Sequence, residues 1–307
     1  MVTRRSLLLA VPALVACGAD HDRPLAVAAG EEGGFYLAFA KLLAEQVNQA
    51  DVGLRCTAVA TEASVANLDL LRTGRADLAL VLADTALTAV AGESPFTSPT
   101  PLCALGRVYE NYMQLVVRMD GPIRTVADLA GRTVSLGAAG SGAALFGERL
   151  LAAAGVRPRV EHLPLADAVA GLAARRIDAL LWSGGVPTPA LADLDSRVGI
   201  LLVSLDLVTS KLRFDYGSVY EPVLVPAGAY QHVQDMRTIG VANLLVGSPS
   251  LPDEVAGAVV SVLVNRAAQL VPQQALGTQF LDARTLVATA GVPLHPGAAA
   301  KYRDLHG

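Results

Sequence analysis

The sequence predicts an α/β protein of two lobes, in which helices cover mixed, mainly parallel sheets and a two-segment hinge joins the lobes. The chain has 307 residues, about twice the length of one domain of roughly 150 residues. Short apolar strands alternate with amphipathic helical stretches, an order typical of parallel sheets. This alternation starts again near residue 133, and the last part of the chain returns to the composition of the first. A chain that leaves one lobe, builds another and comes back joins its lobes through two segments.

The first lobe is predicted from residues 24–114, with residues 241–307 returning to it. Phe35, Phe39 and Val47 recur at helical spacing and predict one buried helix face. The predicted elements are a strand at 25–29, a glycine-bearing turn at 30–34, a helix from Phe35, a strand at 54–60, a helix from Ser64 that ends before Gly74, a strand at 77–82, a strand at 241–246 and helices between 252 and 269.

The second lobe is predicted from residues 115–240 on the same plan. Its elements are a strand at 133–136, a glycine-rich turn at 137–142, a helix at 143–154, a strand near Val160, a helix at 166–174 and a strand at 177–182. The pattern Leu-x-x-x-Arg-x-Asp precedes a buried strand at 71–77 and again at 172–178, which supports two related lobes.

The amino terminus is predicted to be an export signal. Arg4 and Arg5 precede an uncharged, mostly apolar run at 6–16, which has the length of a signal-peptide core. The run ends in LVACG at 14–18, which resembles a bacterial lipobox. We therefore expect residues 1–16 to be a lipoprotein signal peptide and residues 17–23 a linker. Cys17 would attach an extracytoplasmic protein to the cell membrane through a lipid, an ordinary secretory signal being the alternative. Export by the Sec or the twin-arginine route stays open.

Composition narrows the class of protein. Hydrophobic residues make up 52% of the chain and charged residues 17%, which excludes a disordered chain and a coiled coil. No apolar run reaches the length of about 18 residues that a membrane-spanning helix needs, so an integral membrane protein is not expected. The net charge of −4, without a block of Lys or Arg, argues against a nucleic-acid partner. We expect a monomer.

Two cysteines remain beyond the signal, Cys56 and Cys103. Export makes a disulfide conceivable, but both lie in apolar, strand-like stretches, and we expect two free buried thiols. No cysteine or histidine spacing is typical of a metal site, and no metal or cofactor is expected.

No catalytic constellation is found. The sequence has no GxSxG elbow, no GK[ST] and no GxGxxG after a strand, and its five histidines are scattered. We therefore do not expect an enzyme. An exported α/β hydrolase that uses Ser141 is the alternative from that class.

Three predicted helix starts are equipped to bind an anion. Each follows a strand, and a helix start offers unpaired N–H groups and partial positive charge. Together they predict a small anion held between the lobes by backbone N–H groups and neutral side chains. The predicted ligand-binding residues are Gly34, Phe35, Tyr36, Ser64, Asn67, Tyr109, Gly140, Ser141, Gly142 and Trp182, with Asn111 and Tyr112 as secondary candidates.

The order of several motifs resembles the TAXI family, the solute receptors of TRAP transporters. The motifs are Gly33-Gly34-Phe35-Tyr36, Ser64-x-x-Asn67-Leu68, Asp77-Leu78-Ala79, Gly137-x-x-Gly140-Ser141-Gly142, Ile177-Asp178-Ala179 and Pro293-Leu294-His295-Pro296-Gly297. The resemblance implies a type II periplasmic-binding-protein fold, a glutamate-like or dicarboxylate ligand and a sodium-driven TRAP membrane permease as partner.

Two departures from that family bear on the ligand. Ala143 and Ala144 stand where the family has Thr and an acidic residue, and Glu31 and Glu32 in the first turn would repel an anion unless they point to solvent. A ligand-sensing lipoprotein without a permease is the alternative within the binding class.

Overall fold

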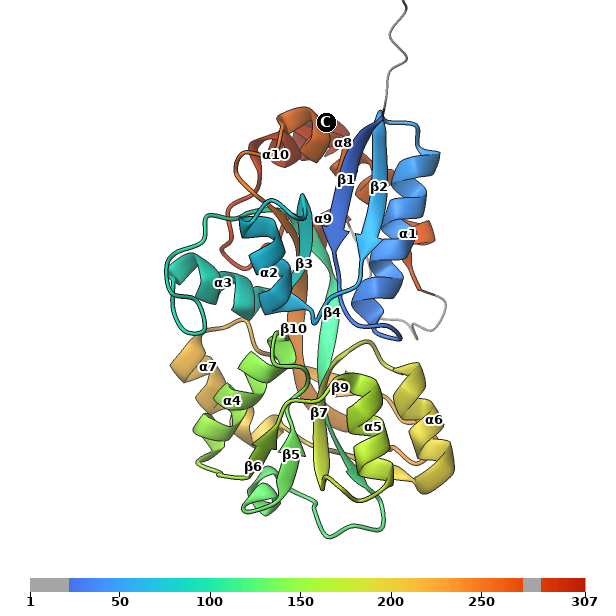
Figure 1. Cartoon of the computed structure of the whole chain (residues 1–307), viewed down its shortest axis with the longest axis vertical. Coiled ribbons are helices and arrows are strands. Elements are labelled where there is room, and N and C mark those ends of the chain that lie inside the picture. Colours follow the sequence, from blue (N-terminus) through green and yellow to red (C-terminus); the bar gives the residue numbers. More distant parts are fainter. Residues whose placement is uncertain (1–21, 273–282, 307) are drawn as a thin grey trace, which may run out of the picture.

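The computed structural model describes residues 22–272 and 283–306. Figure 1 shows two lobes stacked along the long axis, with the amino-terminal strands and the carboxyl terminus in the same lobe. The predicted signal peptide and Cys17 lie outside the described residues. In the part that is described, no helix is long and apolar enough to cross a membrane.

The elements follow the predicted order. The first lobe holds β1 (Arg23–Ala28), α1 (Phe35–Gln49), β2 (Leu54–Val59), α2 (Ser64–Arg72), β3 (Leu78–Leu82), α3 (Ala83–Ala91), α8 (Asp253–Asn265), the 3-10 helix η2 (Ala267–Leu270), α9 (Ala283–Leu286) and α10 (Pro296–His306). The second lobe holds the 3-10 helix η1 (Val126–Leu129), β5 (Thr133–Ser135), α4 (Gly142–Ala154), β6 (Arg159–Glu161), α5 (Leu165–Ala173), β7 (Ala179–Gly184), α6 (Pro189–Val198), β8 (Ile200–Val203), α7 (Asp206–Tyr216) and β9 (Glu221–Val225).

Two long strands, β4 (Cys103–Arg118) and β10 (Met236–Gly247), run through both lobes (Figure 1). They pair with each other in antiparallel fashion and join the strands of both lobes into one ten-stranded sheet of order β2-β1-β3-β10-β4-β7-β5-β6. β8 pairs with β4 and β9 pairs with β10 off this path. The pairs β1–β2, β1–β3, β5–β6 and β5–β7 are parallel. The sheet is therefore parallel toward its two ends and antiparallel at its centre.

The elements with a clear period were predicted well, and those without one were missed. Helix α1 buries Phe35, Phe39 and Val47 on one face, as their spacing requires. β4 was recognised only in part, because Glu110 and Gln114 interrupt its apolar residues and are themselves buried. No prediction was made for helices α3, α6, α7 and α10 or for strands β8 and β9.

The core has one apolar cluster that reaches into both lobes. It contains Leu82 and Ala83 of the first lobe and Phe146 and Tyr220 of the second, all buried. The rings of Phe146 and Tyr220 lie 5.6 Å apart. Both of these rings belong to the second lobe. The lobes meet directly where the Leu82 side chain packs on Gly142 of α4, since a Cβ there would lie only 2.6 Å from it.

The prediction of two free thiols is confirmed, although only one of them is fully buried. Cys56 lies in the core, and burial raises the pKa of its thiol to about 12. Cys103 is partly exposed.

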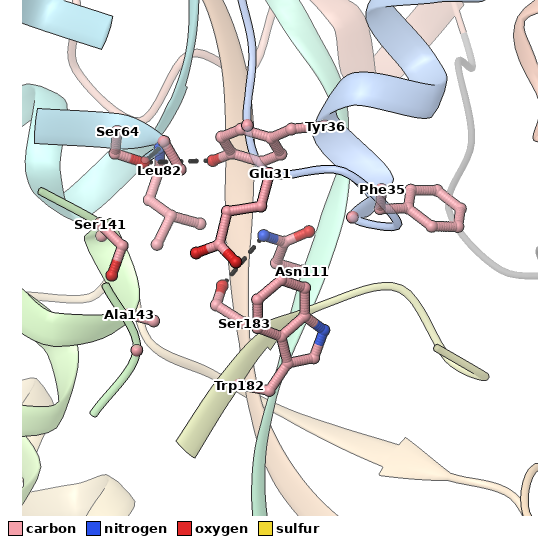
Figure 2. A pocket seen from close by; sticks show the side chains of 15 residues that line it. Glu31, Phe35, Tyr36, Ser64, Leu82, Asn111, Ser141, Ala143, Trp182 and Ser183 are labelled. Carbon is pink, nitrogen blue, oxygen red and sulfur yellow. Dashed lines mark hydrogen bonds between the residues drawn. The ribbon is translucent and has the colours of Figure 1, made fainter. Parts of the chain in front are cut away.

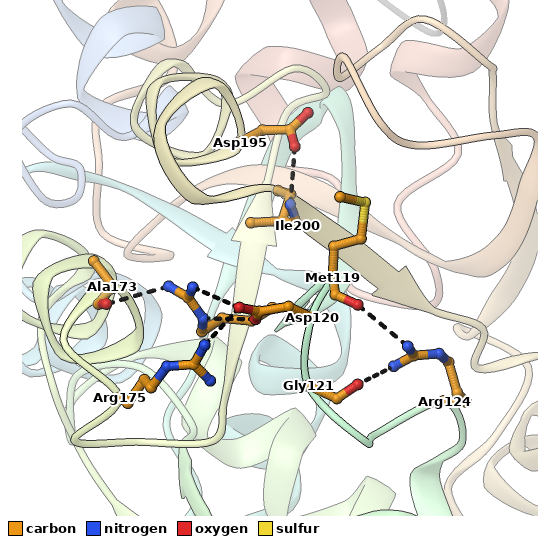
Figure 3. Close-up of polar contacts among 9 residues, drawn as sticks. Met119, Asp120, Gly121, Arg124, Ala173, Arg175, Asp195 and Ile200 are labelled. Atoms are coloured by element: carbon orange, nitrogen blue, oxygen red, sulfur yellow. Dashed lines mark hydrogen bonds and ion pairs between the residues drawn. The ribbon is translucent and has the colours of Figure 1, made fainter.

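The far end of the second lobe is fixed by arginine contacts (Figure 3). Arg118 donates two hydrogen bonds to the Asp120 carboxylate, at 3.0 and 3.1 Å, and a third to the Ala173 carbonyl at 3.2 Å. Arg124 donates to the carbonyls of Gly121 and Met119. These contacts tie the loop after β4 to the end of α5, away from the space between the lobes.

Candidate ligand-binding site

A cavity of about 30 Å³ lies between the two lobes. Its walls are the segments that follow β1, β2 and β5, the last residues of β3 and β7, and Asn111 in the middle of β4. Apart from Asn111, it therefore lies at the carboxyl ends of the strands, where open α/β sheets bind ligands. It is lined by Gly30, Glu31, Gly34, Phe35, Tyr36, Ala63, Ser64, Leu82, Asn111, Gly137, Ser141, Gly142, Ala143, Trp182 and Ser183. Figure 2 shows these side chains converging from both lobes.

Seven of the ten residues predicted from the sequence line this cavity. They are Gly34, Phe35, Tyr36, Ser64, Ser141, Gly142 and Trp182. The secondary candidate Asn111 lines it as well, whereas Tyr112 is buried in the core of the second lobe. All three predicted helix starts therefore contribute residues to the cavity, but Asn67 and Gly140 from two of them do not line it.

Ser64 connects three segments at the cavity wall. Its Oγ accepts the Leu82 N–H at 3.1 Å and lies 3.3 Å from the Tyr36 hydroxyl. These contacts link the starts of α1 and α2 to the end of β3. Burial raises the pKa of Tyr36, so its hydroxyl stays protonated at neutral pH.

Asn67 does not line the cavity, contrary to the prediction. Its amide donates to the carbonyls of Ala29 and Leu80 at 2.5 and 2.7 Å, and its Oδ1 accepts from the Thr61 hydroxyl at 2.5 Å. The side chain is 0% exposed. Asn67 therefore holds the loops after β1 and β2 in place. Ser64 of the same helix lines the cavity, whereas Asn67 does not.

Tyr109 is also displaced from its predicted role. Its ring packs against Phe35, Tyr36 and Phe39, with centroids 5.4, 6.2 and 5.3 Å away. It lies behind the aromatic residues of α1 and is not among the residues that line the cavity.

Gly140 acts across the gap between the lobes and is not part of the cavity lining. Its carbonyl accepts the N–H groups of Val65 and Ala66 at 3.0 Å each, and its own N–H donates to the Glu62 carboxylate at 3.2 Å. The start of α2, which was predicted to hold an anion, is therefore filled by a carbonyl of the second lobe in this conformation. The N–H groups that were predicted to bind a ligand anion bind the Gly140 carbonyl instead.

Glu31 and Glu32 behave differently, and the difference matters for the ligand. Glu32 is exposed and pairs with Lys41 at 3.4 Å. The Glu31 side chain extends from its loop toward the middle of the lining residues (Figure 2) and accepts the Leu165 N–H at 2.7 Å, at the start of α5 in the other lobe. Burial raises the pKa of the Glu31 carboxyl, and the charges of Glu62 and Asp167 add to the rise.

Asn111 and Ser183 form the floor of the cavity. Asn111 donates from Nδ2 to the Ser183 Oγ at 2.9 Å, while its Oδ1 is buried and has no partner in the part of the chain that the structure describes. Ser183 was not predicted, because a serine within an apolar strand carries no signal until the strand that faces it is known.

Ser141 caps the start of α4. Its Oγ accepts the Ala144 N–H at 3.1 Å, the usual contact of an N-cap residue. Gly142 and Ala143 follow at the cavity wall, so the first N–H groups of α4, which have no partner within the helix, lie there. Among the described residues, no group of three His, Cys, Asp or Glu side chains could hold a metal ion.

Solved structures share this architecture. A protein from Bordetella bronchiseptica RB50 is 16% identical, with a TM-score of 0.56 over 94% of this chain and 99% of that chain. An ancestral arginine-binding protein bound to arginine is 14% identical, with a TM-score of 0.54 over 81% and 96%. The alkanesulfonate-binding protein SsuA from Xanthomonas axonopodis pv. citri, bound to MOPS, is 18% identical, with a TM-score of 0.50 over 91% and 83%.

At these sequence identities the similarity shows the fold alone. The fold is that of type II periplasmic-binding proteins, so the predicted fold class is confirmed. The sequence itself matches the NMT1-like family over residues 27–305, from β1 to the last turn of α10. That match covers nearly all of both lobes and does not single out the TAXI subtype that the motifs resemble. The chain is a member of the NMT1-like family.

Proposed function

We propose that this protein is an extracytoplasmic solute receptor that captures a small molecule between its lobes and delivers it to a membrane permease. The observation that carries the proposal is the cavity itself, which both lobes line at the carboxyl ends of their strands. The fold it shares with periplasmic binding proteins supports the same role. The motif resemblance favours a TRAP permease of the TAXI type as the partner.

Capture requires the lobes to separate. We take residues 24–114 and 241–307 as one lobe and residues 115–240 as the other, turning about β4 and β10. A volume of 30 Å³ has room for about two water molecules. A larger solute therefore enters only when the contacts of Gly140 and Glu31 across the gap are open, and the lobes then close on it. A ligand that touches both lobes shifts the equilibrium toward the closed form.

Solute binding is tested on the purified protein. Denaturation should release a small molecule that mass spectrometry identifies, and its return to the stripped protein should lower the radius of gyration measured by small-angle scattering. A dissociation constant of micromolar or better, about −8 kcal/mol, is expected. If no molecule is released, and a bacterial metabolite extract leaves the radius of gyration unchanged, the receptor function is wrong.

The lipid anchor is a separate part of the proposal and rests on LVACG at 14–18. Two acyl chains on Cys17 would hold the protein at the membrane, whereas one chain binds only weakly. Cys17→Ser should leave unprocessed precursor and abolish labelling by a fatty-acid probe in cells, and Cys103→Ser is the matched control. Equal labelling of the Cys17→Ser variant and the natural chain would contradict the anchor.

A further inference from the structure

The charge of the cavity differs from what an anionic ligand needs. Among the described residues, its lining includes the carboxylate of Glu31 and no Lys or Arg side chain. The other charged groups that act on Glu31 are Glu62 and Asp167, both acidic. A dicarboxylate placed here would meet a like charge at short range, which destabilises binding.

The floor of the cavity lacks a donor. Asn111 is 2% exposed, and its Oδ1 is buried without a partner in the described chain. A buried acceptor without a donor is unfavourable, because it has lost its hydrogen bonds to water and gained none in the protein. Ser183 already receives the Asn111 N–H, so an N–H donor on a molecule in the cavity could satisfy this oxygen.

The aromatic wall favours the same charge. The indole N–H of Trp182 donates to the Thr188 Oγ1 at 3.0 Å, so this ring meets the cavity with carbon atoms and not with its N–H group. Indole is the aromatic side chain that attracts cations most strongly. Trp182 lines the cavity together with Glu31 and Asn111.

We propose that the ligand carries a primary ammonium group, held between the Glu31 carboxylate and the Asn111 Oδ1 beside Trp182, and at most one carboxylate. The ammonium group supplies the missing N–H donor and balances the buried carboxylate. A single carboxylate on the same ligand is compatible with the start of α4, where Gly142 and Ala143 offer their N–H groups. The assignment deepens the receptor function and rests on it.

The test compares two molecules of similar length, 4-aminobutyrate and glutarate, by calorimetry on the stripped full-length protein at pH 7.5. The amine should bind at least tenfold more tightly. Glu31→Gln keeps an acceptor for the Leu165 N–H and should weaken amine binding tenfold or more without weakening glutarate binding. Glu32→Gln, in the same loop but exposed, is the control and should change neither. Amine binding should weaken on acidification, because the Glu31 carboxyl with its raised pKa takes up a proton, and this loss should be absent in Glu31→Gln.

Each result decides for or against the ammonium group. Tighter binding of glutarate, or amine binding that Glu31→Gln leaves intact, overturns it while the receptor function stands. If neither molecule binds, the ligand released from the purified protein decides, and one without a protonated nitrogen also overturns the assignment. Release of no molecule, with no change in the radius of gyration, removes the receptor function itself.

Discussion

Gly142→Ala is expected to weaken ligand binding by roughly tenfold or more while the protein stays folded. A Cβ at this position would lie 2.6 Å from the Leu82 side chain and 2.8 Å from the Ser64 Oγ, both on the opposite lobe. Overpacking of this kind costs about 1–3 kcal/mol, and each 1.4 kcal/mol is a factor of about ten in affinity. The cost falls on the closed form alone, because the two lobes meet there.

Alanine should not harm the second lobe on its own, because it favours the first turn of α4 more than glycine does. The measurement pairs calorimetry with scattering, and the variant should keep a larger radius of gyration at saturating ligand. Gly171→Ala is the matched control, since its Cβ would meet Ile177 at an ordinary 3.5 Å within one lobe. Unchanged affinity and full closure in Gly142→Ala would show that the lobes do not meet at this position in the bound state.

Arg149→Leu is expected to destabilise the closed form by about 3–5 kcal/mol near pH 8, the cost of removing one partner from a buried charged pair. Because Arg149 and Asp84 belong to opposite lobes, opening the lobes exposes Asp84 to water, and the free energy of unfolding falls by at most this amount. Arg149 of α4 lies 3.8 Å from the Asp84 carboxylate of α3, with side chains 12% and 0% exposed. It also donates to the Thr88 Oγ1 at 2.7 Å and to the Tyr220 hydroxyl at 3.0 Å. Tyr220 in turn donates to Asp84 at 2.9 Å. The variant leaves a buried carboxylate without its cation.

The loss should depend on pH in one direction. Burial already raises the pKa of Asp84 in spite of Arg149, and removing Arg149 raises it further. The folded variant therefore takes up a proton more readily than the unfolded chain, so the deficit is largest at high pH and shrinks as the pH falls through the raised pKa. Urea denaturation at pH 8 and pH 5 measures this.

Arg72→Leu is the control for the Arg149 experiment. Arg72 is 58% exposed and pairs with Asp69 on the surface of α2, and such pairs contribute at most about 1 kcal/mol. Adding Asp84→Asn to Arg149→Leu should recover part of the loss. A deficit that is the same at both pH values would show that the buried carboxylate is not its cause.

The sequence predicted the features that depend on neighbours along the chain. The helix face of Phe35 and Phe39, the helix that Gly74 ends and the glycine-rich turn before α4 all rest on local spacing and turn chemistry. Gly74 follows the end of its helix with a φ of +68°, the left-handed conformation in which glycine commonly ends helices. These local signals pointed to seven of the fifteen residues that line the cavity, with Asn111 as a secondary candidate.

The roles that depend on the other lobe were not predictable. Gly140 looked like part of an anion site, but its carbonyl meets the start of α2, 75 residues or so earlier in the chain. Glu31 was noted only as an obstacle to an anion, because the α5 start that it caps lies 134 residues away. Asn67 has the predicted spacing from Ser64, yet it points at the backbone of β3. The periodicity of a sequence shows which residues lie on the same face of a helix or strand. It does not show which other part of the chain packs against that face.

The pairing of β4 with β10 makes the connection between the lobes a twisted ribbon with no free loop in it. Its register runs from Ile239 opposite Met113 to Gly247 opposite Cys103, with irregular steps after Asn243 and after Leu245. Irregularities of this kind increase local twist in an antiparallel pair. In the opening that we propose, rotation of one lobe against the other would twist these two paired strands, so the strain of opening would fall on the ribbon and favour its return.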